Sequence, residues 1–132
     1  MEGVCEWRTG RTWYRVSGNG GRTPLLCLHG GPGSTHHYFA PLERLAGERR
    51  VVVYDQLGCG RSPADGDVEW SLALFLEELD ALRAHLGLDR VHLLGTSWGG
   101  MLALEYAFTQ PEGLASLVLN STPTSAPRWA RA

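Results

Sequence analysis

The sequence predicts an α/β protein built on a mostly parallel sheet. Four short, continuous apolar runs, at residues 25–28, 51–54, 91–94 and 114–119, have the composition of strands that are buried on both faces. Helical patterns lie between these runs, and strands that alternate with crossover helices form parallel sheets covered on both sides. The chain has 132 residues, 43% hydrophobic and 20% charged, which is typical of a globular domain.

The first strands are expected to form an antiparallel edge of this sheet. Residues 12–17 alternate like a half-buried strand, and the glycine-rich stretch at residues 18–21 is typical of a turn. Together with the apolar run that follows, this pattern predicts an early hairpin. The expected order of elements is β-β-β-α-β-α-β-α-β.

Three helices are predicted between the strands. The clearest covers residues 71–86, with Gly87 as its C-cap. Its apolar face comprises Leu72, Phe75, Leu76, Leu79, Leu82 and Leu86. Its polar residues, expected mostly on the other face, are Glu77, Glu78, Asp80 and Arg83. A second helix is predicted at residues 38–46, and a third runs from residue 98 to about 109, where Pro111 follows.

Composition and charge exclude several classes of function. The net charge of −2 comes from 14 acidic and 12 basic residues spread along the chain, so we expect no nucleic-acid or membrane-binding surface. All 12 basic residues are arginines, and a Schiff-base mechanism needs a lysine amine that this chain lacks.

Location and metal content are predicted from the same composition. No signal peptide or long apolar span is found, and three cysteines without C-x-x-C spacing indicate a reducing compartment, so a cytoplasmic protein is expected. The five histidines show no ligand spacing such as H-E-x-x-H, and a metal site is not expected.

The strongest functional signal is GTSWGG at residues 95–100, a G-x-S-x-G directly between a predicted strand and a predicted helix. Such a turn presents the serine hydroxyl above the sheet, and small neighbours such as Gly95 and Gly99 let the backbone bend tightly. Ser97 is therefore the candidate nucleophile. The start of the following helix directs backbone N–H groups at the same space, which makes the N–H of Trp98 a candidate oxyanion donor.

A second signal, HGGPG at residues 29–33, follows the buried strand at residues 25–28. A glycine-rich loop in this position can bring a backbone N–H close to a substrate carbonyl, and Gly31 is the preferred second donor. His29 is expected to anchor the loop through its ring nitrogens rather than act as a base.

A third signal, DQLGCGRS at residues 55–62, follows the strand at residues 51–54 but lacks the third glycine of a dinucleotide fingerprint. Asp55 is expected to fix a turn by hydrogen bonds and an ion pair with Arg61 rather than to act as a catalytic acid. Cys59 has no local base and is not expected to be a nucleophile. Tyr38 and Trp98 either line a substrate pocket or simply cover the sheet, and the sequence favours neither.

The order and separations of three motifs resemble those of the proline iminopeptidase family of α/β-hydrolases. They are HGGPG at residues 29–33, DQLGCGRS at 55–62 and GTSWGGMLALEYA at 95–107. The resemblance covers essentially the whole chain, and the first two motifs together are more specific than the serine elbow alone.

This resemblance implies the N-terminal part of an α/β-hydrolase fold, with the nucleophile elbow present and the cap and C-terminal strands missing. Residues 1–120 would belong to the hydrolase domain, and residues 121–132 would begin the connection to a helical cap. Ser97 would attack the scissile carbonyl of a small peptide or amino-acid amide, and the N–H groups of Gly31 and Trp98 would hold the oxyanion. An N-terminal residue, often proline, would be released, and no cofactor is implied.

The family's mechanism also needs a histidine base and an acid, which follow the serine in this fold. After Ser97 the only acids are Glu105 and Glu112, and no histidine follows, so the chain by itself is expected to be inactive. Two alternatives stay open. The first is an esterase or lipase with the same elbow, and the second is a non-catalytic remnant or binding module.

Overall fold

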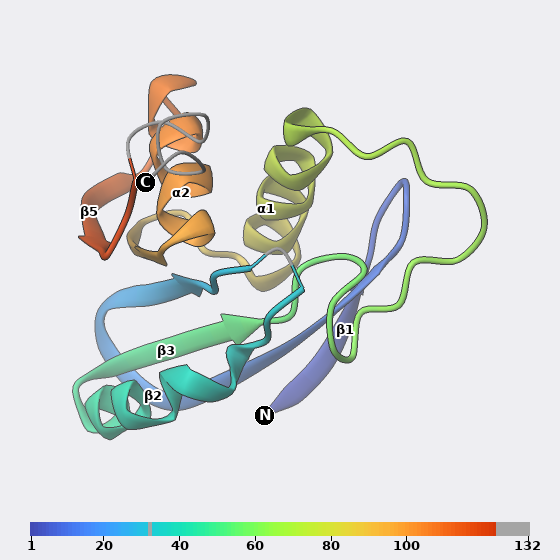
Figure 1. Cartoon of the computed structure of the whole chain (residues 1–132). Helices are drawn as coiled ribbons and strands as arrows, with labels where there is room; N and C mark the ends of the chain where they lie inside the picture. The colour runs from blue at the N-terminus through green and yellow to red at the C-terminus, as the bar shows by residue number, and fades with distance from the viewer. Residues whose placement is uncertain (32, 124–132) are drawn as a thin grey trace.

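The computed structural model describes residues 1–31 and 33–123, so Pro32 and most of the predicted cap connection at residues 121–132, namely residues 124–132, lie outside the described residues. Five strands form one sheet in the order β1-β2-β4-β5, and β3 pairs with β2. The strands are β1 (Glu2–Glu6), β2 (Arg11–Leu28), β3 (Arg49–Tyr54), β4 (Val91–Thr96) and β5 (Leu114–Asn120). Figure 1 shows β5 at one side of the fold and β1 toward the other.

The predicted antiparallel edge and parallel centre are both present. β1 pairs antiparallel with β2, whereas the later part of β2 pairs parallel with β4, and β4 pairs parallel with β5. The predicted strands at residues 25–28, 51–54, 91–94 and 114–119 all lie within observed strands. The α/β class with a mostly parallel centre is therefore confirmed.

The predicted hairpin at residues 18–21 is wrong. Residues 14–17 of β2 lie antiparallel to residues 51–54 of β3, and residues 25–27 of the same strand lie opposite residues 51–53 with both numbers rising. Both halves of β2 thus flank β3 instead of pairing with each other, and the chain between them curves around the start of β3 (Figure 1). The reason is that the fully buried run at residues 25–28 needs a partner on each side, and β3 and β4 supply them.

Helices cover both faces of the sheet, as the sequence predicted. Helices α1 (Leu72–Leu86) and α2 (Trp98–Phe108) pack on one face over a core that includes Leu26, Val52 and Leu93. A 3-10 helix, η1 (His36–Gly47), covers the other face, where Phe39 packs against Val51 and Val53. No helix in the described part of the chain is both long and apolar enough to cross a membrane.

The predicted helix at residues 38–46 is longer than expected and is a 3-10 helix rather than an α-helix. Pro41 lies inside it, and a proline lacks the N–H that an α-helical hydrogen bond at this position would use.

Helix α1 begins at Leu72, one residue after the predicted start at residue 71. The Ser71 hydroxyl caps α1 by accepting from the N–H of Leu74 at 3.1 Å, and Gly87 ends it in the left-handed region.

Two residues predicted on the polar face of α1, Glu78 and Arg83, are in fact buried. The Glu78 carboxylate accepts hydrogen bonds from the Thr12 hydroxyl and the Leu57 N–H. The Arg83 guanidinium donates to the Tyr106 hydroxyl and to backbone carbonyls of residues 88, 89 and 112. Burial of a charged group is tolerated where it is hydrogen-bonded, and helical periodicity alone does not reveal such partners.

Candidate active site

Ser97 is the single residue between the end of β4 at Thr96 and the start of α2 at Trp98. Its backbone has φ 55° and ψ −119°, a conformation that a non-glycine residue rarely adopts and that costs about 1–3 kcal/mol. Its N–H donates to the Asn120 carbonyl of β5 at 3.1 Å, which holds the strained turn in place. The predicted strand–serine–helix elbow is therefore present.

Gly95 and Gly99, the two small residues predicted to be needed at the elbow, lie where a side chain would collide with backbone atoms. A Cβ at residue 99 would lie 2.5 Å from the His29 carbonyl oxygen and nearer still to that of Leu28. A Cβ at Gly95 would meet the backbone of residues 99 and 100. Because these obstacles are backbone atoms, only glycine lets α2 pack this closely on the loop after β2.

The glycine-rich loop after β2 lies directly beside the candidate nucleophile. A Cβ at Gly30 would be 3.3 Å from the Cβ of Ser97 and 3.3 Å from the hydroxyl oxygen of Tyr38. The Tyr38 hydroxyl accepts a hydrogen bond from the Gly30 N–H, which fixes this residue of the loop. Gly31, the predicted oxyanion donor, comes next in the same loop with φ 127°.

The predicted anchoring role of His29 agrees with its contacts. Its ring is fully buried, Nε2 accepts from the Gln56 N–H at 2.9 Å, and Nδ1 lies 2.7 Å from the Gly30 carbonyl. Nε2 is an acceptor, so the proton is on Nδ1, which donates to Gly30. Burial lowers the pKa of His29, which keeps the ring neutral in this arrangement.

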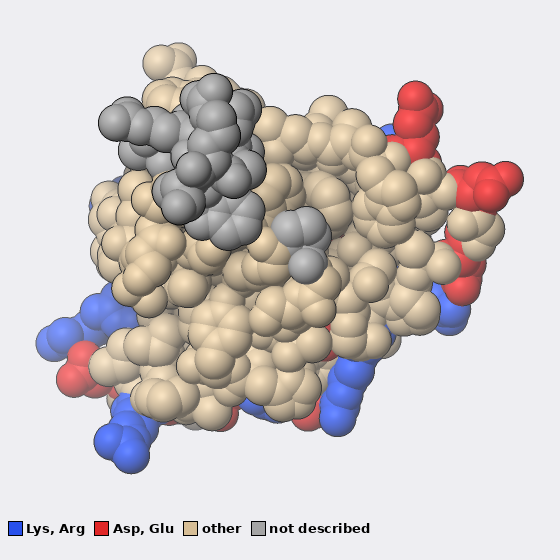
Figure 2. Space-filling view, in the orientation of Figure 1, with Lys and Arg blue, Asp and Glu red and all other residues tan. Residues whose placement is uncertain are grey.

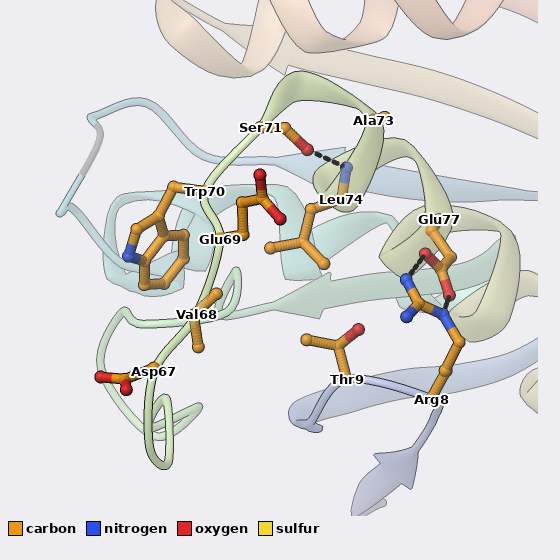
Figure 3. A pocket seen from close by; sticks show the side chains of 10 residues that line it. All are labelled: Arg8, Thr9, Asp67, Val68, Glu69, Trp70, Ser71, Ala73, Leu74 and Glu77. Carbon is orange, nitrogen blue, oxygen red and sulfur yellow. Dashed lines mark hydrogen bonds and ion pairs between the residues drawn. The ribbon is translucent and has the colours of Figure 1, made fainter.

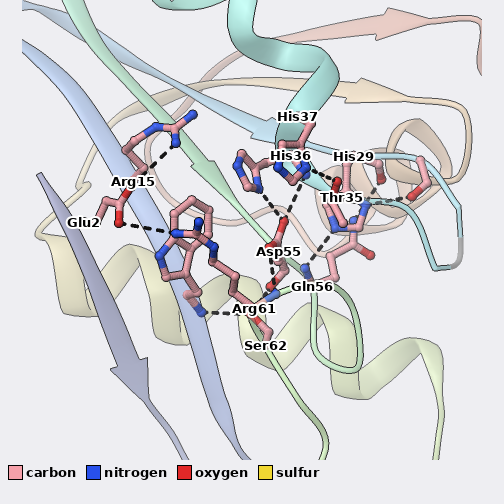
Figure 4. A network of polar contacts seen from close by, with 12 residues as sticks. Glu2, Arg15, His29, Thr35, His36, His37, Asp55, Gln56, Arg61 and Ser62 are labelled. Carbon is pink, nitrogen blue, oxygen red and sulfur yellow. Dashed lines mark hydrogen bonds and ion pairs between the residues drawn. The ribbon is translucent and has the colours of Figure 1, made fainter.

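Asp55 fixes the turn after β3 by hydrogen bonds, as predicted, but the guanidinium of Arg61 forms its ion pair with Glu2 and not with Asp55. Its carboxylate accepts from the Arg61 backbone N–H at 3.0 Å and from both the backbone N–H and Nδ1 of His36, at 3.0 and 2.7 Å (Figure 4). Burial alone would raise the pKa of Asp55, and these hydrogen bonds lower it instead. The Arg61 guanidinium instead lies 3.5 Å from Glu2 and over the Trp13 ring.

The cysteines do not compete with Ser97 as nucleophiles. All three are free and buried, and burial raises the pKa of Cys59 and raises that of Cys27 to about 12. A thiol with a raised pKa stays protonated and is a poor nucleophile. Among the described residues, no group of three or more His, Cys, Asp or Glu side chains could hold a metal ion.

Tyr38 and Trp98 do more than cover the sheet. Tyr38 is 44% exposed and holds Gly30, while the Trp98 indole N–H donates to the Gln56 side-chain oxygen at 2.9 Å. The Trp98 ring also packs edge-on against Phe75 of α1, with ring centroids 5.9 Å apart. Both aromatic side chains therefore tie the elbow and the glycine loop to neighbouring elements.

A cavity of about 550 Å³ lies at the N-terminal end of α1 (Figure 3). Its lining includes Trp70, Leu74 and the ion pair between Arg8 and Glu77, whose closest atoms are 2.6 Å apart. Ser97 is not among its lining residues.

On the face of the molecule shown in Figure 2, acidic and basic side chains lie around the edge of the view and uncharged residues form the centre.

Comparisons with known proteins agree with this geometry. The family described as the alpha/beta hydrolase fold matches residues 23–132, so the chain belongs to that family. It is 55% identical to a proline iminopeptidase of Levilactobacillus brevis, over 99% of this chain and 46% of that protein. It is 49% identical to a proline iminopeptidase of Clostridium botulinum, over 97% of this chain and 45% of that protein.

A solved structure gives the same result. The crystal structure of a proline iminopeptidase from Mycobacterium smegmatis matches with a TM-score of 0.91 and 38% identity, over 99% of this chain and 47% of that one. The resemblance predicted from the three motifs is therefore confirmed. The chain spans about half the length of the curated relatives that it matches.

Sequence reasoning missed the part that Gln56 plays at this site. The residue is 1% exposed, and its side chain bonds to both the His29 carbonyl and the Trp98 indole. The available signal was the position of Gln56, one residue after Asp55 at the end of a buried strand, where parallel strands gather functional residues.

Proposed function

We propose that the whole protein is a serine aminopeptidase that releases an N-terminal residue, often proline, from small peptides or amino-acid amides. The observation that carries this proposal is Ser97, held at φ 55° between β4 and α2 with the Gly30 loop against it. The similarity to proline iminopeptidases over nearly the whole chain supports the choice of substrate class.

In the proposed reaction, the Ser97 hydroxyl attacks the carbonyl carbon of the N-terminal residue while a base takes its proton. The N–H groups of Gly31 and Trp98 stabilise the oxyanion, and the amine or ammonia leaves as the acyl-enzyme forms on Ser97. Water then attacks the acyl-enzyme and releases the free amino acid. The N–H of Trp98 lies in the first turn of α2, where no intrahelical acceptor exists.

The base and its orienting acid are expected in the part of the relatives that this chain does not span. No histidine follows Ser97 in the chain, and the two later acids, Glu105 and Glu112, are both exposed. We therefore expect a polypeptide of residues 1–132 alone to show no aminopeptidase turnover, which an assay with a proline anilide would check.

The main test is Ser97→Ala in the full-length gene product, assayed with proline p-nitroanilide. Loss of the nucleophile should lower kcat by at least ~10⁴-fold without unfolding the protein. Ser116→Ala is the matched control, because this serine lies on β5 and contacts His92 rather than the elbow. Equal activity of the Ser97 variant and the wild type would refute the proposal.

Two further substrates separate the alternatives. Turnover of p-nitrophenyl esters without turnover of proline anilide would indicate an esterase that shares the elbow. If the wild type turned over neither substrate and its Ser97 did not react with a fluorophosphonate, a binding or vestigial role would replace catalysis.

A further inference from the structure

Gln56 connects two segments that are far apart in the sequence. Its backbone N–H donates to His29 Nε2, and its side-chain Nε2 donates to the His29 carbonyl, both at 2.9 Å (Figure 4). Its side-chain Oε1 accepts from the Trp98 indole N–H, also at 2.9 Å. One buried amide group therefore joins the loop after β2 to the first residue of α2.

These two segments are the ones that carry the proposed oxyanion donors. Gly31 follows His29 by two residues, and the second donor is the backbone N–H of Trp98 itself. We propose that Gln56 is a positioning residue that fixes these two backbone donors relative to each other. This inference rests on the proposed function, because it assigns a part in stabilising the same oxyanion.

The hydrogen bonds require an amide in one orientation. The Gln56 side chain must accept from the Trp98 indole N–H and donate to the His29 carbonyl, and the flipped amide would oppose donor to donor and acceptor to acceptor. An ionised carboxylate of the same shape can still accept from Trp98 but cannot donate to His29. A protonated carboxyl can do both.

The cost of losing this link is expected in catalysis more than in substrate binding. Oxyanion donors act at about 2.7–3.1 Å from the developing charge, and a misplacement of about 1 Å costs about 100-fold in rate. Ground-state contacts with the rest of the substrate do not depend on the separation of these donors. A positioning role therefore predicts a lower kcat with little change in KM.

The test is Gln56→Glu in the full-length protein, assayed from pH 5.5 to 8.5 with proline p-nitroanilide. At pH 8 we expect kcat to fall roughly 10- to 100-fold, with KM within about threefold of the wild type. The ratio of variant to wild-type kcat should rise toward 1 as the pH falls, because the introduced carboxyl regains its proton and donates to His29 again.

Other titrating groups around this position are the same in both proteins, so they largely cancel in the ratio. They are His29 after β2, Asp55 after β3, His36 of η1 and Glu78 of α1. Gln110→Glu is the matched control, because it makes the same chemical change at an exposed residue beyond α2. This control should keep wild-type kcat at every pH.

A fluorophosphonate probe separates this inference from the proposed substrate. Its reaction with Ser97 uses the oxyanion hole but does not depend on aminopeptidase specificity. If the wild type is labelled but does not hydrolyse proline p-nitroanilide, only the proposed substrate class is refuted. The labelling rate of Gln56→Glu should then show the same loss and the same recovery at low pH. A loss in Gln56→Glu that does not recover at low pH would overturn the positioning role. A ratio that stays at 1 would overturn it when the rate of Trp98→Phe, which lacks the indole N–H at every pH, is also unchanged.

If Gln56→Glu does not fold, Trp98→Phe provides the second test. Phenylalanine keeps an aromatic ring against Phe75 but lacks the indole N–H that binds Gln56. We expect kcat or the labelling rate to fall about 10-fold with KM retained. An unchanged rate in this variant would equally contradict the inference.

Discussion

The buried carboxyl of Glu78 should make the stability of the protein depend on pH. Glu78 is fully buried between α1 and β2, and one of its oxygens accepts from the Thr12 hydroxyl at 2.5 Å and the Leu57 N–H at 2.8 Å. Its other oxygen has no hydrogen-bond partner among the described residues. Burial raises the pKa of Glu78 from 4.5 to about 7, although these two hydrogen bonds oppose the rise.

The sign of the effect follows from where the proton is bound. Between pH 4.5 and about 7 the folded protein keeps this proton while the unfolded chain loses it, so stability falls as the pH rises through this window. A pKa difference of this size corresponds to about 3 kcal/mol, lost in full above pH 8. The Glu78→Gln variant cannot titrate and keeps an acceptor for Thr12 and Leu57.

Urea unfolding of the full-length wild type and of Glu78→Gln at pH 5, 6, 7 and 8 would measure this effect. The two proteins should be about equally stable at pH 5, and the variant should become more stable by up to about 3 kcal/mol at pH 8. Other titrating groups contribute equally to both. A difference in the free energy of unfolding that stays constant across this range would refute the reasoning.

Two further substitutions test the packing of the elbow and of the helix ends. Gly99→Ala should destabilise the full-length protein by about 2 kcal/mol or more and slow fluorophosphonate labelling of Ser97, because its Cβ would collide with backbone carbonyls. Gly47→Ala, where a Cβ meets nothing within 4 Å, should change neither property. Arg83→Lys should cost about 2–4 kcal/mol in urea unfolding, because one ammonium cannot replace the guanidinium's four hydrogen bonds. Arg90→Lys, at an exposed position, should leave stability nearly unchanged.

Local sequence was sufficient for the elbow and for the helix α1. The helix predicted at residues 71–86 is observed at 72–86 with the predicted C-cap Gly87, and Ser71, which the prediction placed inside the helix, is its N-cap. The elbow was predictable because its requirement for small residues at 95 and 99 is met within six consecutive residues. Even the loop at residues 29–31 could be placed near Ser97, since parallel strands end at the same edge of the sheet.

Long-range contacts decided what the sequence pattern could not. The glycines at residues 18–21 look like a hairpin turn, but β3, which follows more than 25 residues later, inserts between the two halves of β2. Glu78 looks solvent-exposed by helical period, and only the approach of Thr12 and Leu57 makes its burial favourable. In both cases the deciding partner comes from a distant element.

The sequence by itself thus determined the α/β class, the position of Ser97 and the family resemblance, because each depends on neighbouring residues or on motif order. Only the tertiary structure showed that Gln56 joins His29 to Trp98, two residues 69 positions apart, and that the turn of Asp55 is held by His36. The physical reason is that a hydrogen bond depends on where donor and acceptor meet in space. That meeting is set by the packing of strands and helices, which no local pattern encodes.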